Sequence, residues 1–148
     1  MRSPLLITLL VYPLMVGGSN AEGHDDLTGL WRTVRHGALV DIADCGDSTP
    51  CGTLTWISEA ISEGNTTDIH NRNHALRIRP LIGLPILWGF ECREAVCQNG
   101  RLYNPEDGKT FRAHMQLLSA AKLRVSGCLG PLCRSQIWTR EDTSETKE

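Results

Sequence analysis

The chain has 148 residues and a formal net charge of −2, with 41% hydrophobic and 22% charged residues. This composition is ordinary for a globular protein, and the length suits one domain with one hydrophobic core. A nearly neutral chain without a basic run is not expected to have nucleic acid as its main partner.

The first residues have the pattern of an export signal. Arg2 precedes an apolar run over residues 5–16, and Ser19 and Ala21 place small side chains where signal peptidase requires them. The run is too short to span a bilayer, and no later stretch approaches the roughly 20 apolar residues that a transmembrane segment needs. We predict a signal peptide cleaved after Ala21, in preference to an uncleaved anchor or a buried strand.

This prediction divides the chain into three parts. Residues 1–21 are the signal peptide, residues 22–140 form a single β-barrel domain, and residues 141–148 are a polar tail. The mature protein is expected in the periplasm or outside the cell, without a transmembrane segment.

The body of the chain has the pattern of strands and not of long amphipathic helices. Short segments alternate polar with apolar residues and are rich in β-branched and aromatic residues. In the third strand Leu54 and Trp56 are expected on one face. A polar loop is expected from residue 59 to about residue 74, and a ninth strand over residues 75–79 is an alternative. The eight predicted strands cover residues 30–35, 38–44, 52–58, 86–92, 97–103, 109–118, 122–128 and 133–140.

The segment Asn-Pro-Glu-Asp-Gly at residues 104–108 predicts a tight turn. Proline presets φ there, and glycine accepts the backbone conformation that closes a hairpin. The strand that follows alternates, which predicts that Phe111, Ala113, Met115 and Leu117 share one face.

The cysteines predict three short disulfides. An even number of cysteines in an exported chain is typical of disulfide bonding, because that compartment is oxidising. The cysteines fall into three close couples that bracket turn residues, so each bond is expected to cross-link a hairpin near its tip. A loop this short contributes about 2 kcal/mol on the loop-entropy model. The predicted pairs are Cys45–Cys51, Cys92–Cys97 and Cys128–Cys133.

A zinc site is the weaker interpretation of one couple. His70 and His74 have a spacing typical of zinc ligands and could join Cys92 and Cys97. The other two couples resemble this one and have no histidines to match. No Cys-x-x-Cys redox motif is present, and we expect neither a bound metal nor a cofactor.

Many short strands joined by tight turns predict a barrel or sandwich. Gly29 and Trp31 open the first strand and Arg140 closes the last, so in a closed barrel Arg140 could stack on Trp31 as a cation–π cap. This is similar to the signature of the calycin group, which includes lipocalins and avidins. We predict an all-β, closed or nearly closed, antiparallel up-and-down barrel of about eight strands, lipocalin-like, with disulfide-stapled hairpins.

Alternate connections of such a barrel lie at the same end. Trp31, Arg140 and the first two disulfide-bonded tips are then expected at one end, which the Trp–Arg pair closes. The segment of residues 59–80, the turn at residues 104–108 and the third tip are expected at the other end. That second end would be the mouth, with the long segment as its lid.

Two blocks are specific, Arg-x-Arg-Pro-Leu-x-Gly at residues 77–83 and Tyr-Asn-Pro-x-x-Gly-Lys at residues 103–109. With several other segments they resemble a bacterial family, domain of unknown function 2147. The resemblance covers about residues 27–140 and implies an exported bacterial protein with a lipocalin-like barrel, with no known activity and no established catalytic residues. The Cys92–Cys97 couple looks like an addition to the family pattern. The matching segments are residues 29–31 (Gly-Leu-Trp), 42–46 (Ile-Ala-Asp-Cys-Gly), 50–52 (Pro-Cys-Gly), 68–73 (Asp-x-x-Asn-x-Asn), 76–83 (Leu-Arg-Ile-Arg-Pro-Leu-Ile-Gly), 100–111 (Gly-Arg-Leu-Tyr-Asn-Pro-Glu-Asp-Gly-Lys-Thr-Phe), 123–128 (Leu-Arg-Val-Ser-Gly-Cys) and 136–140 (Gln-Ile-Trp-Thr-Arg).

Polar residues in the long segment are candidates for binding. If residues 75–79 are extended, Arg77 and Arg79 project to one face and could hold an anionic head group by paired donors; solvated arginines or partners for carboxylates are the alternative. Asn71 belongs to a polar cluster with Asp68, His70, Asn73 and His74. We interpret that cluster as a loop whose Asn and Asp side chains bond the backbone, with a ligand or metal site as the alternative.

Aromatic residues complete the candidate set. Trp88 and Tyr103 are candidate ligand contacts, and Trp56, Trp88 and Trp138 either line a cavity or fill the barrel. Ser126 and Ser135 lack a positioned histidine, so nucleophilic catalysis has no support. The leading hypothesis is a non-enzymatic barrel that binds a small amphipathic or apolar ligand, with Arg77 and Arg79 near its polar end. The alternative is an envelope interaction or maintenance protein whose barrel is solid and whose loops bind a protein partner.

Overall fold

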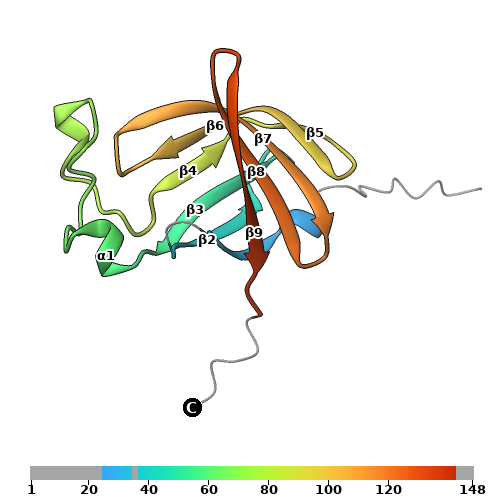
Figure 1. Ribbon diagram of the computed structural model, residues 1–148, viewed down its shortest axis with the longest axis horizontal. Helices are drawn as coiled ribbons and strands as arrows, with labels where there is room; N and C mark the ends of the chain where they lie inside the picture. The colour runs from blue at the N-terminus through green and yellow to red at the C-terminus, as the bar shows by residue number, and fades with distance from the viewer. Residues whose placement is uncertain (1–24, 35–36, 143–148) are drawn as a thin grey trace, which may run out of the picture.

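The computed structural model describes residues 25–34 and 37–142 (Figure 1). The predicted signal peptide, its cleavage after Ala21, and the tail from residue 143 lie outside the described residues. The described part contains nine strands and three short helices. The strands are β1 (Gly29–Arg32), β2 (Leu39–Asp44), β3 (Pro50–Trp56), β4 (Pro85–Trp88), β5 (Glu91–Arg93), β6 (Val96–Asn104), β7 (Lys109–Ser119), β8 (Lys122–Leu129) and β9 (Leu132–Arg140). The helices are η1 (Asp25–Leu27), α1 (Glu59–Ser62) and η2 (His74–Leu76).

The strands form one closed antiparallel barrel. Their order is β4-β3-β2-β1-β9-β8-β7-β6-β5, and β4 also pairs with β6, which closes the sheet. β4 and β5 pair with successive stretches of β6, so together they occupy one of eight positions. Gly89, with φ of +72°, separates them and breaks the single strand predicted over residues 86–92. The predicted up-and-down barrel is confirmed.

The seam between the first and last strands is held by backbone and side-chain bonds. Trp31 is opposite Arg140 in the β1–β9 register. Arg32 donates to both carboxylate oxygens of Glu141 at 2.8 and 2.7 Å, and this pairing lowers the pKa of Glu141. Glu141, which the sequence assigns to the tail, is therefore fixed against the barrel.

Alternation along the strands directs apolar side chains inward, as expected for a pleated sheet. On β7 the predicted inner face is confirmed, because Ala113 and Met115 are buried and Phe111 and Leu117 are half-buried. The interior is lined from all sides of the barrel. Its most buried side chains include Trp31, Val40, Ile42, Leu54, Leu87, Cys97, Met115 and Leu123.

Trp56 is an exception to the predicted pattern of β3. Leu54 is buried, but Trp56 is 43% exposed and lies outside the barrel. Leu39 is opposite Trp56 and Val40 is opposite Leu54, so β3 has one extra residue, Thr55, between Leu54 and Trp56. A bulge of this kind reverses the face that later side chains occupy. Outside the barrel, the guanidinium of Arg32 lies over the ring of Trp56, with its carbon 5.9 Å from the ring centroid.

The long segment between β3 and β4 contains no ninth strand. Residues 75–79 lie in η2 and the turns after it, because the side chain of Asn73 accepts a hydrogen bond from the backbone N–H of Ala75 and caps that helix. The expectation that Arg77 and Arg79 project together from an extended segment is therefore wrong. A bridge between Thr67 and Pro80 closes the segment into a compact excursion.

All three predicted disulfides are confirmed: Cys45–Cys51, Cys92–Cys97 and Cys128–Cys133. The bonding of Cys92 to Cys97 removes both from the zinc site considered above. Disulfides are typical of an oxidising compartment such as the periplasm or the extracellular space. In the part of the chain that is described, no helix has the length and apolar character needed to cross a membrane.

Candidate ligand-binding cavity and outer groove

One end of the barrel is closed by Arg140 and Trp31. The guanidinium carbon of Arg140 lies 4.3 Å from the centroid of the Trp31 ring. Its three nitrogens donate to the carbonyls of Asp26, Thr28 and Ala120 at 2.5–2.6 Å. The indole N–H of Trp31 donates to the carbonyl of Leu27, which completes the plug. The predicted cation–π cap is confirmed.

The opposite end opens into a cavity of about 870 Å³. Its wall is largely apolar and comes from strands on every side of the barrel: Val40 of β2, Leu54 of β3, Ile86 of β4, Leu102 of β6, Phe111 of β7, Val125 of β8 and Trp138 of β9. The pocket therefore occupies the mouth end of the barrel, and Val40, Leu54 and Val125 at its base are almost fully buried. The volume falls in the range of pockets that hold small organic molecules.

Small inward-facing residues leave this space open. Ala38 and Gly127 both line the cavity. Gly127 lies on β8 between Ala113 and Arg134, and a side chain there would first meet the tip of Leu102 at 3.3 Å. A larger side chain at position 127 would project into the space that the cavity occupies.

The mouth of the cavity is polar. Ile57 and Ile61 line one side of it, and the turn of residues 104–109 and the β8–β9 hairpin line the rest. Charged lining residues are Glu106, Asp107, Lys109 and Arg134. The segment after β3, the turn of residues 104–109 and the β8–β9 hairpin therefore meet at one end of the barrel, as the alternation of connections predicts. Of the long segment, Ile61 reaches this cavity, so the segment as a whole is not the lid that the sequence predicts.

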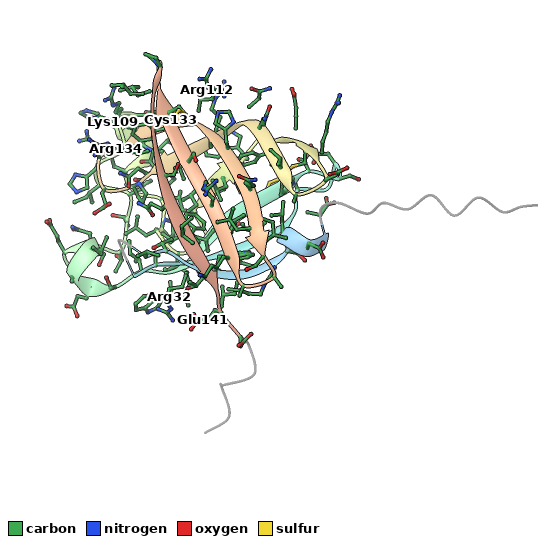
Figure 2. All side chains as sticks on the ribbon, turned by 45° about the vertical axis from the view of Figure 1, so that its right-hand side comes forward. Arg32, Lys109, Arg112, Cys133, Arg134 and Glu141 are labelled. Atoms are coloured by element: carbon green, nitrogen blue, oxygen red, sulfur yellow. A yellow bond between two sulfur atoms is a disulfide. The ribbon has the colours of Figure 1, made fainter. Side chains whose placement is uncertain are left out.

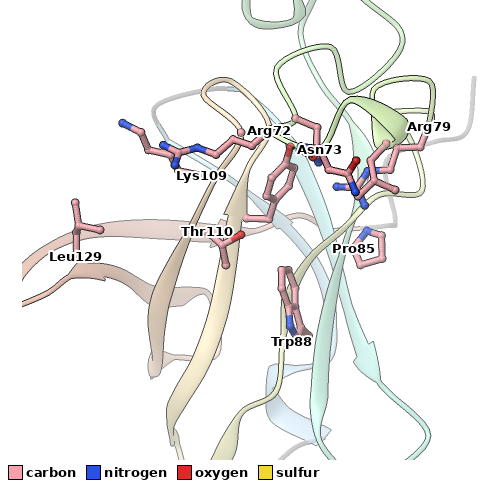
Figure 3. Close-up of a pocket in the computed structure, with 12 residues that line it drawn as sticks. Arg72, Asn73, Arg79, Pro85, Trp88, Lys109, Thr110 and Leu129 are labelled. Atoms are coloured by element: carbon pink, nitrogen blue, oxygen red, sulfur yellow. Dashed lines mark hydrogen bonds between the residues drawn. The ribbon is translucent and has the colours of Figure 1, made fainter.

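A second depression, of about 680 Å³, lies on the outer surface of the barrel (Figure 3). Leu87 packs against Gly52 inside the barrel and Leu102 lines the cavity, so their strand neighbours Trp88 and Tyr103 face outward. The long segment lies over these outward residues and makes the other wall. We call this depression the outer groove, and its lining is Asn71, Arg72, Asn73, Leu76, Arg79, Pro85, Trp88, Tyr103, Gly108, Lys109, Thr110 and Leu129.

Three cations line the groove, and carboxylates outside its lining partner two of them, Arg79 through Asp68 and Lys109 through Asp107. Figure 3 shows Arg72 and Lys109 on one side and Arg79 on the other, above Trp88. Among the described residues that line it, none is a carboxylate. An anionic group with a flat apolar part fits this combination of cations and aromatic rings.

A buried polar network attaches the long segment to the barrel. Asp68 is fully buried and accepts a hydrogen bond from the hydroxyl of Tyr103 at 2.6 Å. It also accepts from the side-chain amide of Asn71 and pairs with Arg79, both at 2.8 Å. The charge of Asp68 is thus matched, as a buried carboxylate requires. Burial, and then the hydrogen bond to Asp68, raises the pKa of Tyr103 to about 12.

The structure brings four of the five candidate ligand-binding residues together. Asn71, Arg79, Trp88 and Tyr103 all line the outer groove. Arg77 does not, because its Nε donates to the backbone carbonyl of Asn71 at 2.7 Å. The hypothesis that Arg77 and Arg79 lie at the mouth of the internal cavity is wrong for both residues.

Sequence reasoning missed Asp68 as the centre of this network. It interpreted the polar cluster as a loop bonded to its own backbone, which holds for Asn71 and Asn73, each of which accepts a backbone N–H two residues later. Two features of the sequence could have pointed to Asp68. It is a carboxylate three residues before Asn71, and Tyr103, on a predicted strand, needs a partner for its hydroxyl. In the described residues no group of three or more histidine, cysteine or acidic side chains could hold a metal ion.

A comparison with known protein families finds a match that spans the whole barrel. The model of a family described as "Uncharacterized protein conserved in bacteria (DUF2147)" matches residues 29–140, from Gly29 to Arg140. The chain belongs to this family. The match covers all nine strands of the DUF2147 protein described here, including both walls of the outer groove.

The fold of this DUF2147 protein is also similar to a solved structure. The structure is that of protein HP1028 from the human pathogen Helicobacter pylori, which is described as belonging to the lipocalin family. The TM-score is 0.70 with 20% sequence identity, and the similarity covers 80% of this chain and 85% of that one. At this identity the likeness establishes a lipocalin-like barrel. No curated protein matches the chain.

Proposed function

We propose that this DUF2147 protein is a non-enzymatic binding protein that holds a small, largely apolar ligand inside its barrel. The observation that carries the proposal is the pocket of about 870 Å³ at the mouth end of the barrel, whose opposite end is plugged by Trp31 and Arg140. Burial of apolar ligand surface in such a space is favourable by about 25 cal/mol per Å². The lipocalin-like fold supports this use of the interior.

The distribution of polar groups favours an amphipathic ligand. The inner wall is apolar, whereas Lys109 and Arg134 line the mouth. A ligand with an apolar body and an anionic or polar end would place the body on Val125 and Trp138. Its polar end would lie beside Arg134, which replaces Arg77 and Arg79 in this role.

The place of action that we propose is the periplasm or the extracellular space. The export pattern of the first twenty-one residues and the three disulfides support it. The pocket at the mouth supports the ligand-binding hypothesis over the alternative of an envelope protein with a solid barrel.

Binding of an uncharged apolar fluorophore tests the proposal. N-phenyl-1-naphthylamine should bind the mature protein with increased emission and with energy transfer from Trp138, which lines the cavity. Val125→Trp fills the cavity and should weaken binding about tenfold or more. Ala38→Leu is a smaller change at the same cavity and should weaken it less.

Thr110→Trp is the matched control, because Thr110 lines the outer groove and points away from the interior. It should leave fluorophore binding unchanged. Circular dichroism establishes that each variant is folded. Equal binding by wild type, Val125→Trp and Ala38→Leu would show that the cavity is not the site.

The outer groove is a second candidate site, favoured by Arg72 and its aromatic floor, with Arg79 already paired to Asp68 and Lys109 close to Asp107. We propose that it takes an anionic group attached to a flat ring, through Asn71, Arg79, Trp88 and Tyr103 with Arg72 and Lys109. Calorimetric titration with 1-naphthyl phosphate should show binding that Arg72→Ala weakens and Arg124→Ala does not. Indifference of the affinity to Arg72→Ala would contradict this site.

A further inference from the structure

The β8–β9 hairpin ends in an exposed apolar tip. Leu129 and Leu132 are opposite each other in the register, and their exposed fractions are 66% and 77%. Gly130 and Pro131 form the turn between them, and in Figure 1 this hairpin projects beyond the rest of the barrel. The Cys128–Cys133 disulfide lies directly behind the leucines. The tip is therefore both apolar and cross-linked.

Cations surround the base of this tip. Arg112 is opposite Cys128 on the neighbouring strand, and Arg134 follows Cys133 (Figure 2). Lys109 lines the same cavity mouth as Leu129. Within the described residues, neither Arg112 nor Arg134 forms an ion pair with a carboxylate.

The acidic residues that line the same mouth are Glu106 and Asp107, on the turn of residues 104–108. Asp107 lies 3.8 Å from the ammonium group of Lys109 and so partly neutralises it. Arg112 and Arg134 keep their charge available. A chain with a formal net charge of −2 thus carries local positive charge at the apolar tip of the β8–β9 hairpin.

We propose that this surface, made of Leu129, Leu132, Arg112, Arg134 and Lys109, docks on an anionic lipid bilayer. Exposed leucines next to cations are the combination that binds at a lipid interface, since apolar burial and attraction to anionic headgroups act together. The leucines enter the interface and the arginines contact lipid phosphates.

Charge complementarity favours a bilayer over a second copy of this chain. A two-fold contact through the tips would place Arg112 and Arg134 of one copy near the same residues of the other. Like charges in such a contact repel each other, whereas an anionic surface attracts all of them.

Docking in this orientation places the cavity mouth at the membrane surface. Leu129, Leu132 and Arg134 belong to both the tip and the mouth. An apolar molecule dissolved in the bilayer would then have a short path into the barrel. The docking itself depends on the surface alone and goes beyond the binding function proposed above.

Co-sedimentation of the mature protein with vesicles tests the proposal. The protein should bind vesicles of phosphatidylglycerol and phosphatidylethanolamine and should bind phosphatidylcholine vesicles at least about tenfold more weakly. Added salt should weaken the binding, because it screens exposed charges. The double variant Leu129→Ser/Leu132→Ser should lose most of it, and each of Arg112→Glu and Arg134→Glu should weaken it about fivefold or more.

Leu118→Ser and Arg93→Glu are the matched controls. Leu118 is 40% exposed near the β7–β8 turn and Arg93 is exposed at the Cys92–Cys97 tip, both at the plugged end of the barrel. These two variants should bind vesicles as the wild type does. Arg112→Glu should also retain binding of N-phenyl-1-naphthylamine, because Arg112 does not line the cavity among the described lining residues.

Three results would overturn the proposal. The first is that the wild type fails to bind the phosphatidylglycerol vesicles. The second is that the control variants lose as much binding as the tip variants. The third is that sedimentation velocity shows a dimer that the Leu129→Ser/Leu132→Ser double substitution dissociates. The last result would identify a second copy as the occupant. Failure to bind vesicles with retained fluorophore binding would leave the binding function intact, so the two proposals fail separately.

Discussion

Arg140 occupies the space that a side chain on Gly29 would need. A Cβ atom at position 29 would lie 2.6 Å from Nη1 of Arg140, whose guanidinium also covers Trp31. The first strand, the last strand and the turn at Ala120 therefore meet at one side chain. This contact explains why glycine, tryptophan and arginine stand at the ends of the barrel sequence.

Arg140→Lys should lower the free energy of unfolding by about 1–3 kcal/mol. Lysine has no planar fork that could bond three carbonyls while it stacks on the indole. Urea unfolding followed by tryptophan fluorescence measures the change. Arg124→Lys is the control, because Arg124 is exposed and bonds Gln116 alone among the described residues. Equal midpoints for the two variants would show that the plug does not stabilise the fold.

Gly100→Ala should destabilise the barrel by about 1–3 kcal/mol through overpacking. A Cβ at position 100 would lie 2.3 Å from the ring of Phe90, which packs inside the barrel at 2% exposure. Gly127→Ala is the matched control on β8, because its Cβ would meet Leu102 at 3.3 Å. Thermal unfolding of both variants measures the difference. A larger loss for Gly127→Ala would mean that the interior near Phe90 yields more easily than its packing indicates.

The barrel was predictable because its signals are local. Alternation gave the strands of β6 to β9, and the short cysteine spacings gave the hairpin tips. Closure followed from one pair, Trp31 and Arg140, because a cation–π contact between the first and last strands requires them to be neighbours. What could not be predicted were the bulge before Trp56 and the break at Gly89, which depend on how facing strands fit together.

The sequence predicted most residues of the candidate site, but it did not predict that they line a groove on the outside of the barrel. Asn71, Arg79, Trp88 and Tyr103 were singled out separately, and they meet in the outer groove. Periodicity could not show that residues 75–79 form turns, because the side chain of Asn73 decides this by capping η2. The internal cavity depends on summed side-chain volumes around the barrel, which no single segment reveals.

Cys45→Ser/Cys51→Ser should lower the free energy of unfolding by about 2 kcal/mol, because it returns loop entropy to the unfolded chain. This bridge joins the ends of β2 and β3 at the plugged end of the barrel. Binding of N-phenyl-1-naphthylamine at the opposite end should therefore be unchanged. Denaturant titration and fluorophore titration on the same preparations measure both quantities. Loss of fluorophore binding in a folded variant would mean that the two ends are coupled.

Tyr103 should remain protonated in the folded protein at pH values where an ordinary tyrosine ionises. Burial and the hydrogen bond to Asp68 raise its pKa to about 12, against about 10 in an unfolded chain. The folded state therefore holds this proton more tightly. The stability that it contributes is fully present below about pH 10 and is lost as the pH rises toward the folded pKa.

The chain has two tyrosines, Tyr12 and Tyr103, so a protein that begins after Ala21 reports Tyr103 alone. Tyrosinate absorbance should rise with a midpoint well above that of the same protein in denaturant. Asp68→Asn should lower the midpoint, because it removes the negative charge beside the hydroxyl while burial remains. Tyr103→Phe should abolish the signal and cost about 1–3 kcal/mol, since it leaves Asp68 and Asn71 short of a partner. A midpoint in the folded wild type equal to that in denaturant would show that Tyr103 does not make this contact in solution.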